Sequence, residues 1–174
     1  SKADRLREEL DRLLKEVKEL NERSKRESDR SLEEIKRLIE KVERESEKTL
    51  REVRAKVDDE RIVREAEKIV RETKEELKRL EKRVEEVVRR TKKANDDNLK
   101  AVTDMVRRVR DLLARNVDID TVVEEVKKLI KEILDHIREL VEDDKRKIKE
   151  ILEEIKKLAE DDRRKVEEVK RKVD

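Results

Sequence analysis

The sequence lacks glycine, proline, cysteine and all three aromatic residues, although it runs to 174 residues. A chain of this length with average usage would hold about 12 glycines and about 9 prolines. Glycine enters positive φ freely and proline fixes φ, so strands, tight turns and phosphate-binding loops depend on these two residues. Their absence excludes almost every fold except helices joined by very short connections.

The missing residue types also exclude several kinds of chemistry. Without cysteine there is no disulfide and no zinc site of the Cys/His type. Without aromatic residues there is no stacking platform for bases or for haem-like ligands. We find no signal peptide or other targeting segment, which leaves the localisation unknown, and no apolar run near the ~18 residues that a membrane span needs. We therefore expect no membrane partner.

Charge is abundant but balanced. The chain has 52 basic and 50 acidic residues, a formal net charge of +2, and the two signs are interspersed. Because there is no sustained basic block, we expect no nucleic-acid partner. A composition of 59% charged residues, with Leu, Ile, Val and Ala as nearly all the apolar content, is typical of long helices but also of disorder. The spacing of the apolar residues decides between them.

The apolar positions recur at every eighteenth residue, as Val17, Ile35 and Val53 illustrate. The expected core positions of the first helix begin at Leu6, Leu10, Leu13, Val17 and Leu20, and continue at Ile35, Leu38, Val42 and Val53. The corresponding positions farther along include Leu77, Leu80, Val84, Val87, Val102, Met105, Val126, Ile130, Ile133, Ile137, Leu140, Ile148, Ile151, Ile155 and Leu158. Eighteen residues in five turns is the natural α-helical pitch of 3.6 residues per turn. The repeat therefore predicts nearly straight helices and argues against disorder.

The pattern breaks at two places, which predict the connections. In the first, Asp58 is expected to cap a new helix, with acids in its first turn. In the second, Asn116 is expected to take a left-handed position and Asp118 to cap the last helix. The predicted helices span 2–57, 59–115 and 119–174, each about 84 Å long. Short connections force antiparallel neighbours, so we expect an all-α, straight, up-down-up antiparallel three-helix bundle of about 55-residue helices, forming one domain over 1–174.

Polar residues interrupt the apolar stripes at two heights. The first group is Ser24, Ser28, Ser31, Thr91, Asn95, Asn98 and Asp144, and the second is Ser46, Thr49, Thr73 and Asp162. A hairpin centred near residue 59 pairs Ser24 with Asn95, Ser28 with Thr91 and Ser46 with Thr73. The third helix repeats the level of the first about 117 residues later, which adds Asp144 and Asp162. The sequence thus predicts two candidate core polar layers.

These layers have more than one interpretation. Buried polar groups need partners, so hydrogen-bond networks that set the helix register are the favoured one. A ligand or ion site is an alternative, and Ser and Thr could also bond back to their own helices. A third interpretation treats the segments around Ser31 and 95–98 as helix breaks, since the former fits a capping box. The uninterrupted phase of the repeat argues against breaks.

Catalytic and metal-binding patterns are absent from the sequence. His136 is the only histidine, and Ile133 stands where a di-metal Glu-x-x-His motif needs its glutamate. Neighbouring helical positions lie about 100° apart, so at most one acid of a pair such as Asp143-Asp144 can face the core. No phosphate loop or nucleophile triad is present. We expect no enzymatic activity, no cofactor and no metal.

The chain as a whole resembles de novo designed helical bundles with buried hydrogen-bond networks. The resemblance rests on the ideal phasing of the repeat, the Asp-capped minimal connections, the Glu/Lys/Arg-rich surfaces, the stacked Ser/Thr/Asn layers, and segments such as 43–48 and 25–28. Spectrin-like natural bundles are similar in outline, but they normally contain aromatic core residues and loop Gly or Pro. The resemblance implies a structural role and no catalytic residues.

A structural scaffold is therefore the expected function, with no partner required. The alternative is a helix-binding or self-assembling module, meaning an oligomer or heterodimer building block. The third predicted helix keeps it open, because Leu129/Ile130 and Ile133/Leu134 widen its apolar stripe beyond a two-in-seven seam. A wide stripe also suits a three-helix core. An enzyme or ligand binder comes last.

Overall fold

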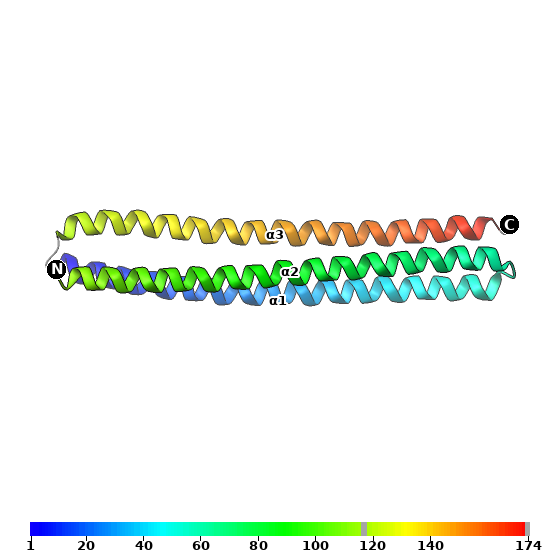
Figure 1. The fold of residues 1–174 in the computed structure, drawn as a ribbon, viewed down its shortest axis with the longest axis horizontal. Coiled ribbons are helices and arrows are strands. Elements are labelled where there is room, and N and C mark those ends of the chain that lie inside the picture. The colour runs from blue at the N-terminus through cyan, green and yellow to red at the C-terminus, as the bar shows by residue number, and fades with distance from the viewer. Residues whose placement is uncertain (116–117, 173–174) are drawn as a thin grey trace. The chain divides into compact units, whose positions relative to one another are not determined.

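The chain is all-α, as the periodicity predicts. The computed structural model describes residues 1–115 and 118–172, and within them it contains α1 (Lys2–Lys56), α2 (Glu60–Leu113) and α3 (Ile119–Arg171) and no strand (Figure 1). The predicted helix ends at 57, 59 and 115 lie at 56, 60 and 113. The expectation of a three-helix bundle built from long helices is confirmed.

The chain divides into two compact units, each containing one stretch of every helix. Unit 1 comprises Ser1–Asp29 and Val88–Lys145, and unit 2 comprises Arg30–Val87 and Arg146–Asp174. In both units α2 runs antiparallel to α1 and α3, as the cross-helix contacts described below require. The assignment of 1–174 to one domain stays a prediction.

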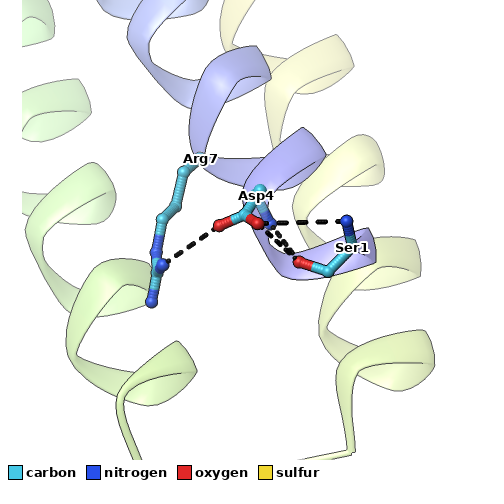
Figure 2. Close-up of polar contacts among 3 residues, drawn as sticks. All are labelled: Ser1, Asp4 and Arg7. Carbon is cyan, nitrogen blue, oxygen red and sulfur yellow. Dashed lines mark hydrogen bonds and ion pairs between the residues drawn. The ribbon is translucent and has the colours of Figure 1, made fainter.

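Each helix begins with a side-chain cap that satisfies free backbone N–H groups. At the start of α1, the Asp4 amide donates to Ser1 Oγ at 3.2 Å, and the Ser1 hydroxyl donates to Asp4 Oδ2 at 2.8 Å (Figure 2). Arg7 Nη1 donates to the other Asp4 oxygen at 3.4 Å. The spacing is that of a capping box, with aspartate in place of glutamate.

The cap of α2 lies one residue later than predicted. Asp59 Oδ1, not Asp58, accepts a hydrogen bond from the Arg61 amide at 2.9 Å. Val57 is 7% exposed and its amide still donates to the Val53 carbonyl at 3.0 Å, so the core holds the chain in the α1 turn until that point. The cap must stand directly before Glu60, which leaves Asp58 as a connecting residue.

The cap of α3 is the predicted one. Asp118 accepts from the Asp120 amide at 3.2 Å and from the Thr121 hydroxyl at 3.1 Å. An aspartate here also places a negative charge at the positive end of the helix dipole. The role predicted for Asn116 lies outside the described residues.

The buried positions follow the predicted repeat, with small corrections. Of the positions expected in the core, Met105, Ile130, Ile133, Leu140 and Leu158 are only half-buried, and so are Leu20, Leu38 and Val87. The residues that follow the last three, Asn21, Ile39 and Val88, are buried instead, at 5%, 2% and 3% exposure. Each helix packs against two neighbours and presents a wide face, so packing decides which of two adjacent candidates lies nearest the centre. Each unit has a hydrophobic core cluster, and Met105 packs against that of unit 1.

Candidate functional site: two buried polar layers

In unit 2 one side chain from each helix meets in a buried triad. The Ser46 hydroxyl donates to Asp162 Oδ2 at 2.9 Å, and the Thr73 hydroxyl lies 2.6 Å from Asp162 Oδ1. All three residues are buried. Thr73 Oγ1 also lies 3.0 Å from the Ile69 carbonyl, so its single proton is shared between that carbonyl and the carboxylate. Each oxygen of the Asp162 carboxylate thus faces a hydroxyl donor.

Unit 1 contains the same triad with looser geometry. The Thr91 hydroxyl donates to Asp144 Oδ1 at 2.5 Å, whereas Ser28 Oγ lies 3.5 Å from Asp144 Oδ2. Asp144 makes further interactions in addition to these two. It is 8% exposed, slightly more than Asp162 at 6%. The carboxylate of unit 1 therefore depends less on its serine.

The two triads occupy equivalent positions in successive repeats of every helix. Ser28 corresponds to Ser46, Thr91 to Thr73 and Asp144 to Asp162. One more repeat in the opposite direction reaches the apolar residues Leu10, Val109 and Val126, all buried in the core of unit 1. One helical position thus occurs three times on each helix, once with an apolar set and twice with a polar set. The same core position can therefore hold either apolar or polar residues, so packing does not require the polar residues of the triads.

A further polar level belongs to unit 1. The Asn95 amide nitrogen donates to Ser24 Oγ at 2.8 Å, and both residues are buried. One turn away lie Asn21 and Asn98. The Oδ1 atom of Asn21 and the Nδ2 atom of Asn98 are buried and have no hydrogen-bond partner among the described residues. An unsatisfied buried amide atom costs about 1–3 kcal/mol. Unit 1 therefore contains two costly polar atoms next to a satisfied pair.

Asn21 was missed as a core polar residue, although the sequence carries a signal for it. The residue numbers of Asn21 and Asn98 add to 119, as do those of Ser24 and Asn95. Asn21 also lies one repeat before buried Ile39. Asn21 was missed because the neighbouring Leu20, as an apolar residue, was assigned to the core instead.

An exposed ion pair borders this level. Lys25 Nζ lies 2.6 Å from Asp96 Oδ1. The hydrogen bond from Lys25 lowers the pKa of Asp96, and a hydrogen bond from Asn21 lowers it further. The same bond to Asp96 raises the pKa of Lys25. The Asn21 side chain thus interacts with the Asp96 carboxylate, while its own oxygen has no donor among the described residues.

Some predicted site residues do not join these networks. Ser31 and Thr49 are half-buried, and the Thr49 hydroxyl donates to the Glu45 carbonyl of its own helix at 2.9 Å. Asn98 is also only half-buried as a whole residue. The alternative of helix breaks is wrong, because α1 continues through Ser31 and α2 continues through 95–98. The expectation of buried, hydrogen-bonding polar residues is confirmed for the two triads and for Ser24 with Asn95.

The groups that meet in the two triads are hydroxyls and carboxylates. His136 is exposed, and no nitrogen base contacts the triad hydroxyls in the bonds given above. Within residues 1–115 and 118–172, no group of three or more His, Cys, Asp or Glu side chains could hold a metal ion. Of the adjacent acids, Asp144 and Asp162 are buried, whereas Asp143 and Asp161 are half-buried. The core thus receives one carboxylate at each triad.

No protein-family model, no curated protein and no solved structure matches this chain. Among the described residues, no helix is both long enough and apolar enough to cross a membrane.

Proposed function

We propose that this chain is a designed structural scaffold with no natural biochemical function, and that its core polar layers set the register of the helices. The observation that supports this proposal most strongly is the recurrence of one Ser-Thr-Asp triad in successive repeats, with hydroxyl donors on both carboxylate oxygens. It occurs at a position that Leu10, Val109 and Val126 fill with apolar side chains. We propose no enzymatic activity, no cofactor and no metal for this chain.

The physical basis is the asymmetry between a satisfied and an unsatisfied buried carboxylate. A buried triad contributes less stability than well-packed apolar residues of similar volume, by about 1–4 kcal/mol. A slipped helix would place Asp162 against leucine or valine, and an uncompensated buried charge costs several kcal/mol. A regularly repeating apolar stripe penalises such a slip far less, because leucine then meets leucine. The layers therefore lower stability slightly and disfavour wrong registers strongly.

The test replaces one polar layer by the apolar residues that the chain uses at the equivalent position. The variant carries Ser46→Leu, Thr73→Val and Asp162→Val, copied from Leu10, Val109 and Val126. Spin labels go on Lys41→Cys and Lys157→Cys, two exposed positions of unit 2, and the absence of other cysteines keeps the labelling specific. Double electron–electron resonance then reports the distribution of distances between the two labels, and so between α1 and α3.

We expect one narrow distribution in the parent and a broader or multiple distribution in the triple variant, together with a gain in stability of about 1–4 kcal/mol. Thr49→Val is the matched control, because it removes a half-buried hydroxyl of α1 that bonds only to its own helix. The control should leave the distribution unchanged. A triple variant that is more stable and keeps the narrow distribution would overturn the proposed role in register.

A further inference from the structure

An apolar groove runs between α2 and α3 in unit 1. Its volume is about 540 Å³, and its lining includes Met105 and Leu112 from α2 and Val122 and Leu129 from α3. A smaller hollow of about 180 Å³ shares Ala101, Leu129 and Ile133 with it and reaches Asn98 and His136. The two hollows form one groove, named here the α2–α3 groove. Along α2 it extends from 98 to 112, about four helical turns or ~21 Å.

Two large apolar side chains are exposed in this groove, one on each wall. Leu112 is 40% exposed and Leu129 is 42% exposed, and these are the exposed large hydrophobic residues of the described part of the chain. Single exposed leucines are ordinary, but two that flank one apolar groove form a patch. The walls are helices, so the groove has the shape that another helix packs into.

In unit 2 an ion pair bridges the equivalent positions of α2 and α3. One repeat away, Ala101 of the groove corresponds to Arg83, and His136 corresponds to Glu154. In unit 2 these two residues form this ion pair, with 2.7 Å between Arg83 Nη1 and Glu154 Oε2. Leu129 corresponds in the same way to Lys147. Unit 1 thus has an alanine, a histidine and a leucine where unit 2 has an arginine, a glutamate and a lysine.

The charged residues that line the groove are mainly acidic. They comprise Asp104, Glu125 and Glu132 against the single base Arg108. None of the four forms an ion pair or a hydrogen bond with another described residue, unlike Arg83 and Glu154 of unit 2. Acidic residues therefore outnumber basic ones in the lining of the groove, which is complementary to a basic partner.

We propose that the α2–α3 groove binds an amphipathic helix of a separate protein, with its apolar face on Leu112 and Leu129 and basic residues flanking that face. A second copy that docks groove to groove is disfavoured as the occupant, because it would bring the same acidic lining against itself. The proposal goes beyond the scaffold function and does not depend on it, since no triad residue lines the groove.

The binding test uses the full chain and a synthetic helical peptide of about three heptads, with leucine at a and d and lysine at e and g, labelled with fluorescein. Fluorescence anisotropy should give saturable binding that weakens as salt screens the charges. The variant carrying Leu112→Lys and Leu129→Lys should bind at least roughly tenfold more weakly, because it removes apolar contact area and adds like charge. Leu32→Lys makes the same chemical change at a half-buried position of unit 2 and should leave binding unchanged.

A second variant guards against loss of folding. Ala101→Arg with His136→Glu copies the Arg83–Glu154 ion pair of unit 2 and should weaken binding while the helical circular dichroism remains that of the parent. A matched peptide with glutamate in place of lysine should bind more weakly than the lysine peptide. Absence of saturable binding, or equal binding by the parent and both groove variants, would overturn the proposal. So would a parent that sediments as a dimer and becomes monomeric in the groove variants, because the occupant would then be a second copy.

Discussion

The two units share the 18-residue repeat but differ in the residues at its core positions. Both carry a Ser-Thr-Asp triad, but unit 1 adds four further polar residues where unit 2 is apolar. The four are Asn21, Ser24, Asn95 and Asn98, and their equivalents in unit 2 are Ile39, Val42, Leu77 and Leu80, all buried. Because apolar burial contributes most of the folding free energy, unit 2 gains more from these levels than unit 1.

The units also differ at their surfaces. In unit 2 the Arg83–Glu154 ion pair bridges α2 and α3, whereas unit 1 has a groove between these helices with Leu112 and Leu129 exposed. Features that lower stability, such as unsatisfied amides and exposed leucines, thus gather in unit 1. We therefore expect unit 2 to be the more stable of the two, and the groove proposed to bind a partner lies in the less stable unit.

The largest effect is expected from removing the donors of a triad while its carboxylate stays. Ser46→Ala with Thr73→Val leaves Asp162 buried without its two hydroxyls and should lower the free energy of unfolding by about 3–5 kcal/mol, measured by urea denaturation. Ser28→Ala with Thr91→Val should cost less, because Ser28 lies 3.5 Å from Asp144 and Asp144 has further partners. An equal or larger loss in unit 1 would contradict the difference between the triads.

The next effect is a gain in stability. Asn21→Ile with Asn98→Leu gives unit 1 the residues of unit 2 and removes two buried atoms that lack partners. We expect the free energy of unfolding to rise by about 2–4 kcal/mol. The control, Ser24→Val with Asn95→Leu, removes a satisfied pair and should raise it by less. If both double variants behave alike, the amides of Asn21 and Asn98 are satisfied in solution.

A smaller effect on stability is expected at the two connections, the α1–α2 connection in unit 2 and the α2–α3 connection in unit 1. Asp59→Ala in unit 2 and Asp118→Ala in unit 1 should each cost about 1 kcal/mol, because each removes an N-cap. Thermal unfolding should show a fall in Tm of about 2–4 °C for each. Asp58→Ala should change stability by less than about 0.5 kcal/mol, and a loss as large as that of Asp59→Ala would restore Asp58 as the cap.

The smallest effect depends on pH. The Lys25 hydrogen bond lowers the pKa of Asp96 in the folded state, so the pair stabilises unit 1 above about pH 4 and loses this contribution as the pH falls through the folded-state pKa. Asp96 is 59% exposed, which limits the contribution to about 0.2–1 kcal/mol. Asp96→Asn should therefore be less stable than the parent near about pH 7 and equal to it near about pH 2. A difference that persists in acid would indicate another cause.

Much of this molecule could be predicted from residue spacing. The repeat located the three helices, and antiparallel numbering paired Ser46 with Thr73 and Ser24 with Asn95, of which the second pair is directly bonded. Spacing did not separate Leu20 from Asn21, because both lie on a wide inward face. It also did not show that the Thr49 hydroxyl bonds to its own helix, since a threonine on a helix can always reach the carbonyl four residues back.

The sequence by itself determined the helices, their order and the heights at which polar residues enter the core. These properties depend on local periodicity and on the lengths of two short connections, which are written directly in the residue order. Only the tertiary structure decided which hydroxyl donates to which carboxylate oxygen, which amides lack a partner among the described residues, and that an ion pair bridges α2 and α3 in unit 2 where unit 1 has an apolar groove. Those outcomes depend on packing among three helices, where a shift of one residue or of less than about 1 Å decides whether a polar atom finds a partner.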